Sequence, residues 1–472
     1  MSAIDADICI IGAGSGGLSV AAGAVQMGAR TVLIEKAEMG GDCLNWGCVP
    51  SKSLIAAAHA ARAIREAGRF GVNGHAPEVD FAAVKAHVHD VIAAIAPGDS
   101  QERFEGLGCT VIRAPAAFTG PGEVAAGKAR IRARRFVVAT GSGPAVPPIP
   151  GLDEVPYLTN ESVFDLDVGP EHLLVIGGGP IAVELAQAHR FLGARVTILE
   201  MAQILGNDDP ELVAVVRRRL VADGIDVREG VGVRAVERAG NGVRVRLGEA
   251  GETVEGSHLL VATGRRPAVD GLGLDRAGIA YGPKGIETDA RLRTTNRHVY
   301  AVGDVAGRHQ FTHVASHHAG VVLKNALFRL PAKVENRAVP WATYCHPEIA
   351  HVGLAEAAAR ARHGAVRVLR WPFAENDLAR TERETEGLVK VVTSRRGRVL
   401  GASIVGAGAG ELIAPWVMAV KERLPIKRMA DLILPYPTLS EASKRAAGTF
   451  YTEALFGPRT RRLVRFLLAL PW

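Results

Sequence analysis

The chain has 472 residues, of which 48% are hydrophobic, and it carries a formal net charge of +7. A chain of this length and composition can bury several cores and is expected to fold into two to four α/β domains. Its basic residues are mostly dispersed, which argues against a nucleic-acid-binding protein, and no apolar run is long enough to span a bilayer. Only five cysteines occur, which excludes a disulfide-stabilised secreted protein and predicts a cytoplasmic location.

A dinucleotide-binding fingerprint lies near the start of the chain. A short β-rich run over 7–11 leads into a glycine-rich turn, an alanine-rich helix and a second strand that ends at Glu35. Gly12 permits a tight turn, Gly14 lets the backbone approach a pyrophosphate, and Gly17 lets helix and strand pack closely. Glu35 stands at the offset at which a carboxylate reaches an adenosine ribose, and the helix N-terminus faces the phosphates. The order of these elements predicts a bound dinucleotide.

Two cysteines, Cys43 and Cys48, follow this fingerprint in the segment 40–52. A close cysteine pair can exchange two electrons with an outside thiol or disulfide, and a neighbouring nucleotide cofactor can supply or accept them. A structural disulfide would close too short a loop to stabilise the fold much, and structural zinc would need more ligands than the nearby sequence offers. Pro50 and Lys52 predict a helix that begins beside Cys48, whose dipole and cation would lower the thiolate pKa.

The nucleotide-binding pattern occurs a second time. A strand over 173–176 leads into Gly177 and Gly179, a helix and a strand that ends at Glu200, with the same separation of first glycine and acid as in the first unit. The tetrapeptide Val-Ala-Thr-Gly also occurs after each unit, so a duplicated architecture and two dinucleotides are expected. Glu200 would accept from a ribose 2′-hydroxyl but repel a 2′-phosphate, which favours NAD over NADP.

Five motifs together indicate a known family. They are the two fingerprints, the Gly-Gly-x-Cys-x-Asn-x-x-Cys-x-Pro-Ser-Lys block at 40–52, Ala-Thr-Gly-Arg-Arg-Pro at 262–267 and Ala-Val-Gly-Asp-Val at 301–305. With them the chain resembles the pyridine nucleotide-disulfide oxidoreductases, the flavoenzyme family that contains dihydrolipoyl dehydrogenase, glutathione reductase and mercuric reductase. The resemblance covers nearly the whole chain.

The resemblance implies an α/β fold of two Rossmann-like dinucleotide-binding domains and an α+β C-terminal dimerisation domain. The expected boundaries are 1–150 with 276–338 for the FAD-binding domain, 151–275 for the NAD(P)-binding domain and 339–472 for the interface domain. The implied cofactors are FAD in the first fingerprint and NAD(H) in the second, and the implied partner is a second copy in a homodimer. Beyond the fingerprints, the expected cofactor-site residues are Thr140, Gly141, Gly264, Gly303 and Asp304, with Asp304 beside the flavin ribitol.

The same resemblance assigns roles around the cysteine pair. Cys48 is the flavin-facing thiol and Cys43 the thiol that exchanges with substrate. Lys52 and Glu184 resemble the family's ion pair near the flavin and the nicotinamide. Electrons would therefore pass from NADH to the flavin, from the flavin to the disulfide through Cys48, and from the freed thiols to a substrate; the reverse direction is equally permitted.

The segment around Tyr436 departs from most of the family. In dihydrolipoyl dehydrogenase and glutathione reductase a histidine before Pro-Thr serves the exchange thiol as acid and base, whereas here Tyr436 stands before Pro437 and Glu441 remains. A phenol titrates at about pH 10 and is a poor proton shuttle near neutrality. Mercuric reductase resembles this chain in carrying a tyrosine here, but it also uses a C-terminal cysteine pair, which this chain lacks.

The expected function is therefore an FAD-dependent NAD(P)H oxidoreductase that passes electrons through Cys43 and Cys48 to a thiol, a disulfide or a soft metal ion. Dihydrolipoyl dehydrogenase and mercuric reductase are the alternatives within the family. A flavin-binding redox sensor or membrane-associated protein with vestigial catalysis is the alternative of another class. No metal site is predicted, because His313 and His317 share a helical spacing without a third ligand.

The last segment, residues 458–472, combines four arginines with leucine, valine and phenylalanine in an amphipathic pattern. Packing against the dimer partner is the favoured interpretation, since an interface domain also needs an apolar face. Weak contact with an anionic membrane surface is the alternative.

Overall fold

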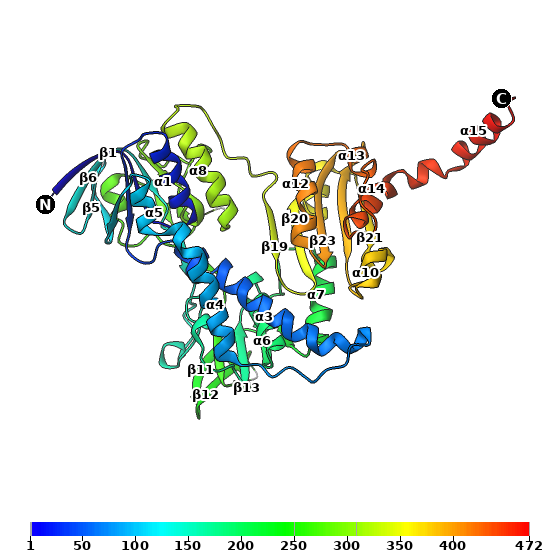
Figure 1. Cartoon of the computed structure of the whole chain (residues 1–472), viewed down its shortest axis with the longest axis horizontal. Coiled ribbons are helices and arrows are strands. Elements are labelled where there is room, and N and C mark those ends of the chain that lie inside the picture. Colours follow the sequence, from blue (N-terminus) through cyan, green and yellow to red (C-terminus); the bar gives the residue numbers. More distant parts are fainter. Residues whose placement is uncertain (1, 250, 308, 472) are drawn as a thin grey trace. The chain divides into compact units, whose positions relative to one another are not determined.

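The computed structural model describes residues 2–249, 251–307 and 309–471. The chain divides into two compact units, one made of the residues up to 201 with 231–334, the other of 202–230 with 335 to the C-terminus. Strands and helices alternate along the first unit, and an antiparallel sheet with helices forms the second (Figure 1). The predicted α/β class is confirmed, and the finer domain boundaries stay a prediction.

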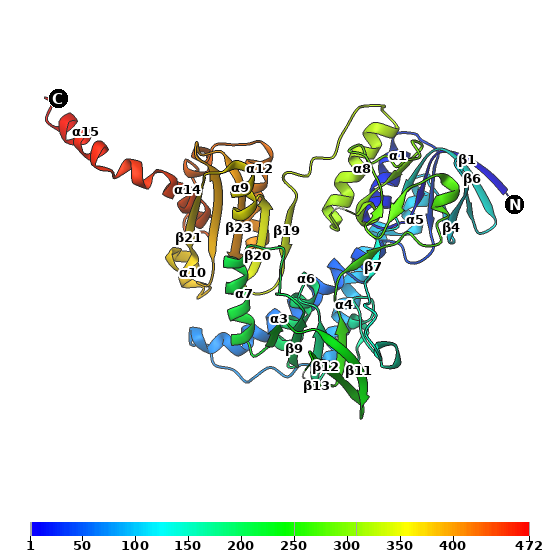
Figure 2. The same cartoon turned by 180° about the vertical axis from the view of Figure 1, so that it is seen from behind.

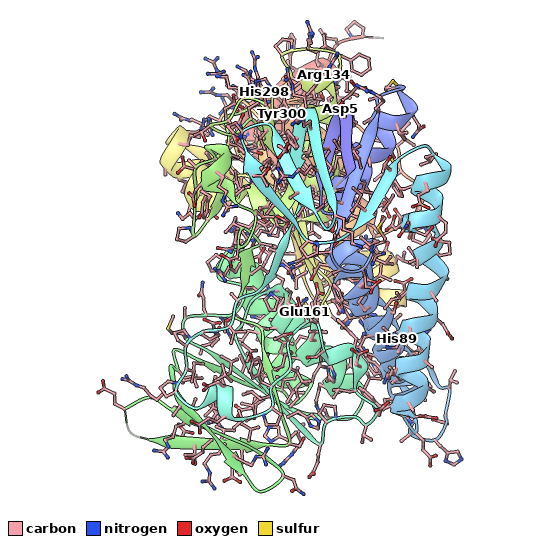
Figure 3. The ribbon with its side chains drawn as sticks, turned by 90° about the vertical axis from the view of Figure 1, so that its left-hand side faces the viewer. Asp5, His89, Arg134, Glu161, His298 and Tyr300 are labelled. Atoms are coloured by element: carbon pink, nitrogen blue, oxygen red, sulfur yellow. The ribbon has the colours of Figure 1, made fainter. Side chains whose placement is uncertain are left out.

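A seven-stranded mixed sheet forms the first nucleotide-binding half of unit 1. Its strands are β1 (Ser2–Ile11), β2 (Thr31–Glu35), β3 (Thr110–Arg113), β4 (Ala116–Gly120), β5 (Glu123–Ala126), β6 (Ala129–Val138) and β18 (Val299–Ala301). The order is β3-β2-β1-β6-β5-β4, and β18 also pairs with β6. β1, β2, β3, β6 and β18 pair in parallel, while β4 and β5 form an antiparallel extension. Tyr300 of β18 stands opposite Val137 in this register (Figure 3).

The parallel strands are apolar on both faces because both faces are covered. Ile8 and Ile10 of β1 join one buried cluster with residues of α1 (Ser15–Gln26) and α8 (Thr312–Ala326), which pack side by side (Figures 1 and 2). Cys9 and Ile11 point to a second buried cluster on the opposite face. This two-sided packing fixes the carboxyl ends of β1 and β2, where the first glycine turn lies.

The second nucleotide-binding half repeats the plan with fewer strands. Its parallel strands are β8 (His172–Ile176), β9 (Arg195–Glu200) and β14 (His258–Val261), with β8 in the middle. The helix α6 (Pro180–Phe191) joins β8 to β9, and an antiparallel meander packs beside them: β11 (Val233–Ala239), β12 (Gly242–Leu247) and β13 (Glu252–Gly256). A short pair, β7 (Ser142–Pro144) with β15 (Arg265–Pro267), links the two halves.

Helices α2 (Gly41–Asn45) and α3 (Cys48–Glu66) carry the cysteine pair, and α4 (Phe81–Ile95) and α6 pack against α3. The short α2 leads into the long α3. On α4, His89 Nε2 lies 3.1 Å from Asp165 Oδ1 and ties that helix to the loop before β8 (Figure 3). The smaller elements of unit 1 are α5 (Gln101–Gly106), β16 (Tyr281–Gly282) and β17 (Gly285–Ile286).

Unit 2 is built on a five-stranded antiparallel sheet in the order β19-β20-β23-β22-β21. The strands are β19 (Pro340–Thr343), β20 (Glu348–Gly353), β21 (Val366–Pro372), β22 (Leu388–Ser394) and β23 (Val399–Gly406). Its other elements are α7 (Pro210–Ala222), β10 (Asp226–Glu229), α9 (Glu356–His363), α10 (Asp377–Thr381), α11 (Ala409–Leu412), α12 (Ala414–Lys421), α13 (Lys427–Ala430), α14 (Ser440–Leu455) and α15 (Pro458–Leu468). Trp416 and Phe373 are fully buried at its core.

A buried cation ties α7 to this sheet. Lys390 of β22 has a side chain only 4% exposed, and its ammonium lies 2.7 Å from Asp209, 2.8 Å from Glu211 and 3.0 Å from Glu356. The pKa of Lys390 is raised because these carboxylates outweigh its burial. Three charge-assisted partners satisfy all three ammonium donors, which is what makes burial of the charge tolerable.

Among the described residues, no helix is long and apolar enough to cross a membrane.

Candidate redox active site

Cys43 on α2 and Cys48 at the start of α3 lie beside one another, and both are thiols in this structure. Gly47 makes the close turn between them feasible, because a β-carbon there would lie 2.8 Å from the carbonyl oxygen of Asp42. Cys48 Sγ also lies 3.5 Å from the hydroxyl of Thr312, at the start of α8. No sequence motif pointed to Thr312, because it lies 264 residues further along the chain than Cys48.

The two thiols differ in acidity. The pKa of Cys48 is lowered to about 6, chiefly by the hydrogen bond from Cys43, with help from Thr312 and the Lys52 cation and against the effect of burial and of Asp42. The pKa of Cys43 is raised, since it keeps the shared proton and is partly buried. A lowered thiol pKa favours the thiolate, which is the reactive form of cysteine. The pair therefore holds one negative charge at neutral pH, on Cys48.

Lys52 and Glu184 form the ion pair that the family resemblance implied. Lys52 Nζ on α3 donates to Glu184 Oε2 on α6 at 2.7 Å. The Glu184 side chain is 7% exposed, whereas that of Lys52 is 37% exposed. The pair fixes α3 against α6 one turn beyond Cys48. Its role toward flavin and nicotinamide stays a prediction.

A second ion pair, not anticipated from the sequence, holds the cysteine loop from the other side. Arg265 Nη2 lies 3.1 Å from Asp42 Oδ2, and the other oxygen of Asp42 accepts from the amide of Asn160 at 3.1 Å. Arg265 Nε donates to the hydroxyl of Ser142 at 2.8 Å, and that hydroxyl donates to Asp304 at 2.5 Å. Burial raises the pKa of Asp304, and Ser142 and Arg265 oppose the rise. Arg265 thus connects the loop before Cys43 with the predicted flavin-site aspartate.

The first glycine turn has the form that a dinucleotide needs. Gly12 has φ +107°, and a β-carbon on it would collide with the carbonyl of Ala139. A β-carbon on Gly17 would collide with the carbonyl of Gly12, so α1 can begin close to β1 only with glycine there. Glu35 is buried at this turn, where Oε2 accepts from the amide of Ala13 at 2.6 Å. Since the acid, the turn and the helix N-terminus meet, these residues fit the adenosine end of FAD.

The remaining residues predicted to lie beside the flavin are in turns with hydrogen bonds or positive φ angles. Thr140 donates its hydroxyl to the carbonyl of Ala268 at 2.7 Å, and Gly141 has φ +69°. Gly303 also has φ +69°, and its amide donates to His318 Nδ1 at 3.2 Å. Burial lowers the pKa of His318 to about 4, which keeps the ring neutral and able to accept.

The second glycine turn repeats the first closely. Gly177 has φ +112°, and a β-carbon on it would collide with the carbonyl of Ala262, which matches the contact between Gly12 and Ala139. Gly179 caps α6 in an extended conformation. The Glu200 side chain lies against Gly178, where a β-carbon would come within 2.9 Å of Glu200 Cγ. Glu200, the acid predicted to bind the NAD(P) ribose, therefore lies at the turn. Gly264, with φ +137°, follows β14 in the same nucleotide-binding half.

Two protein-family models match the chain. The model of the pyridine nucleotide-disulphide oxidoreductases matches residues 6–319, and the model of their dimerisation domain matches residues 339–447. The chain belongs to the pyridine nucleotide-disulphide oxidoreductase family. The matched residues include the cysteine pair, both glycine turns and Asp304.

Curated relatives of this oxidoreductase align over nearly its full length. The mercuric reductase of Streptomyces lividans is 36% identical over 95% of this chain and 96% of the relative. The dihydrolipoyl dehydrogenase of Thermus scotoductus is 36% identical over 95% and 98%, and the glutathione reductase of Burkholderia cepacia is 36% identical over 93% and 98%. The three activities that the sequence motifs brought together are therefore all represented at similar identity.

Solved structures agree with this family assignment. The Cu(II) complex of the HOCl-induced flavoprotein disulfide reductase RclA from Escherichia coli matches with a TM-score of 0.85 and 28% identity, over 93% of this chain and 98% of that one. LpdA from Mycobacterium tuberculosis matches with a TM-score of 0.87 and 28% identity, over 94% and 99%. The predictions of an oxidoreductase enzyme, of FAD with a nicotinamide cofactor and of a homodimer are thus confirmed at the level of the family.

The oxidoreductase places Tyr436 and Glu441 in its dimerisation unit. Tyr436 is 70% exposed, and its hydroxyl donates to Asp377 Oδ2 at 3.1 Å. The pKa of Tyr436 is raised by Asp377, which makes the phenol still less able to release a proton near neutral pH. Glu441 lies in the first turn of α14. Their part in catalysis stays a prediction.

Within residues 2–249, 251–307 and 309–471, no group of three or more His, Cys, Asp or Glu side chains is arranged to hold a metal ion. His313 lies at the start of α8, where its ring stacks on Phe311 with centroids 5.2 Å apart.

Proposed function

We propose that this oxidoreductase reduces a soft metal ion that binds directly to the Cys43 and Cys48 thiols. The observation that carries the proposal is the combination of an acidic Cys48 thiol with a tyrosine where disulfide-reducing relatives have a histidine. Disulfide exchange needs an acid to protonate the leaving thiolate, and Tyr436 serves poorly. A thiophilic cation needs only thiolates, because each sulfur gives up its proton to the solvent as the metal binds.

The names of two relatives support this substrate class. One is called a mercuric reductase, and one solved structure is a Cu(II) complex of a flavoprotein disulfide reductase. No cysteine follows Cys345 in this sequence, so the ion would reach Cys43 and Cys48 without help from a cysteine pair in that segment.

Around the proposed FAD site, Gly12, Gly14 and Gly17 with the N-terminus of α1 would hold the pyrophosphate, Glu35 the adenosine ribose, and Asp304 the ribitol. Bound FAD supplies two-electron transfer between the nicotinamide and the cysteine pair.

The protein's own side chains prepare the thiols for this transfer. Thr312 and Lys52 stabilise the Cys48 thiolate, and Cys43 keeps the proton until substrate arrives. A divalent ion would bind to both sulfurs as thiolates, and Cys43 would release its proton to the solvent on binding. Two electrons from NAD(P)H would take the ion to its elemental state, and Cys43 would take a proton back as the metal leaves. The net change is M²⁺ + NAD(P)H → M⁰ + NAD(P)⁺ + H⁺.

We also propose that NAD is preferred to NADP, and that the enzyme works in the cytoplasm. The support for NAD is the Glu200 carboxylate against the second glycine turn, where a 2′-phosphate would meet a like charge. A Glu200→Ser variant should lose part of its preference for NADH, measured as the ratio of kcat/KM values for the two cofactors. An unchanged ratio would place the discrimination elsewhere.

Anaerobic titration with NADH, followed by a substrate panel, tests the proposed function. Uptake of more than one two-electron equivalent, with a long-wavelength thiolate-to-flavin absorbance, marks a working cysteine pair, whereas bleaching of flavin alone supports a sensor with vestigial catalysis. Turnover of mercuric or cupric ion above that of lipoamide and glutathione disulfide supports the metal substrate. The reverse order, or a Cys48→Ser variant with undiminished metal reduction, contradicts it.

A further inference from the structure

The helix α15 stands apart from the rest of unit 2 in its environment. None of its residues is buried, and Leu463, Phe466 and Leu467 expose 55%, 62% and 53% of their surface. The helix also begins after the matched dimerisation domain, which ends at residue 447. Its apolar residues therefore lie beyond the part of the chain that is shared with the family's interface domain.

Most apolar and basic side chains of this helix lie on opposite faces, with Arg459 on the apolar side and Leu468 on the basic side as the exceptions. Leu463, Phe466 and Leu467 are spaced i, i+3 and i+4, which places them on one stripe. Arg461 and Arg465, four residues apart, lie on the other side, and Arg462 flanks them. The sequence contains no Asp or Glu after Glu453, so nothing within the segment neutralises these charges.

The charge pattern discriminates between possible occupants of the apolar stripe. Two α15 helices packed stripe to stripe would cover the apolar residues but would offer no acidic partner from this segment to the arginines, and the whole chain carries a net charge of +7. An anionic lipid surface instead offers acyl chains to the apolar stripe and phosphate groups to the arginines at the same time. With 11 residues the helix is about 16 Å long, far too short to cross the hydrocarbon core.

We propose that α15 binds flat on an anionic lipid bilayer, with its leucine and phenylalanine side chains in the headgroup boundary and its arginines against lipid phosphates. This peripheral contact goes beyond the redox chemistry and is independent of the substrate.

The test is co-sedimentation of the full-length, FAD-loaded protein with vesicles of phosphatidylcholine alone or mixed with phosphatidylglycerol. A basic residue near an anionic surface contributes about 1 kcal/mol, or about fivefold in partitioning. Replacing three arginines of α15 by glutamine should therefore lower binding to the anionic vesicles on the order of a hundredfold. The replaced residues are Arg461, Arg462 and Arg465.

A matched control removes the same charge elsewhere in unit 2. Three exposed arginines of the β22–β23 turn are changed to glutamine, and this variant should bind almost as the parent does. The control residues are Arg395, Arg396 and Arg398. An equal loss of vesicle binding in both variants would show that net charge alone controls the binding, and it would overturn the proposal.

A second variant separates lipid from a second protein copy as the occupant. Replacing Leu463, Phe466 and Leu467 by serine should abolish vesicle binding while light scattering still reports the parent's oligomeric state. Absence of binding by the intact protein, or dissociation of the oligomer by this variant, would overturn the proposal.

Discussion

The Lys52–Glu184 ion pair should respond very differently to loss of its two members. The Glu184 carboxylate is almost buried, at 7% exposure, while Lys52 is 37% exposed and can turn its ammonium to water. Lys52→Met therefore removes the cation next to a buried negative charge, whereas Glu184→Gln removes the charge of the buried partner, keeps an acceptor in place and leaves a cation that solvent can reach. We expect the lysine variant to be the more damaging.

The size of this difference follows from the environments of the two groups. Removing one partner of a buried pair costs about 3–5 kcal/mol. Because Lys52 is partly exposed, the lower end applies, and Lys52→Met should lower the free energy of unfolding by about 3 kcal/mol. Glu184→Gln loses a charge-assisted hydrogen bond and should cost about 1 kcal/mol.

The assay is denaturant unfolding of the FAD-loaded proteins, followed by circular dichroism. Lys85→Met is the matched control: Lys85 Nζ lies 2.8 Å from Asp167, but that aspartate is 83% exposed. Breaking such a surface pair costs at most about 1 kcal/mol. A Lys52→Met variant that loses no more stability than Lys85→Met, or a Glu184→Gln variant that loses more than Lys52→Met, would contradict the expected difference between the two members of the pair.

Three further predictions concern the cysteine pair. Because the pKa of Cys48 is lowered from 9.0 to about 6, the thiolate-to-flavin absorbance of the two-electron-reduced enzyme should fade as pH drops through about 6, and a fade centred above pH 8 would contradict the assignment. The stability owed to the thiolate should be fully present above the ordinary pKa of 9.0 and should be lost as pH falls from there to about 6. Arg265→Gln should raise the pKa of Cys48, because it removes the cation that compensates the Asp42 charge, whereas Asp42→Asn should lower the same pKa. A shift in the opposite direction in the same spectroscopic titration would contradict this prediction. Tyr436→His should increase the turnover of disulfide substrates on the order of a hundredfold, because it supplies a group that titrates near neutrality, and unchanged kcat/KM for lipoamide and glutathione disulfide would show that the tyrosine does not limit exchange.

The sequence predicted the glycine turns well because their geometry is local. Gly12 and Gly177 need a positive φ and leave no room for a β-carbon beside the strand that follows each unit, at Ala139 and Ala262. Those requirements are set within a single βαβ unit, so a motif of a few residues reports them. The two Val-Ala-Thr-Gly segments contain Ala139 and Ala262, the residues at these contacts, and for the same reason they predicted the duplicated architecture.

The contacts around the cysteine loop could not be predicted in this way. Thr312 reaches Cys48 from α8, and Arg265 reaches Asp42 from β15, through tertiary packing of elements more than two hundred residues apart. Arg265 does lie in a motif that the sequence made visible, but nothing in its spacing identifies Asp42 as its partner. Periodicity reports which face of an element is buried, not which distant side chain completes an ion pair.

The paired carboxylates also bear on the substrate. Asp42 is matched by Arg265 and Glu184 by Lys52, so the charge that changes on reduction is that of the thiols themselves. Once both thiols ionise, the pair carries two negative charges, which a divalent soft cation cancels and a neutral disulfide does not. Because Cys43 must give up its proton as the metal binds, affinity for the cation should rise with pH until the more weakly acidic Cys43 is ionised. A site in which the neighbouring charges are already balanced thus favours cation binding, and on our proposal the turnover of a disulfide, unlike that of the cation, depends on a proton donor at the position of Tyr436.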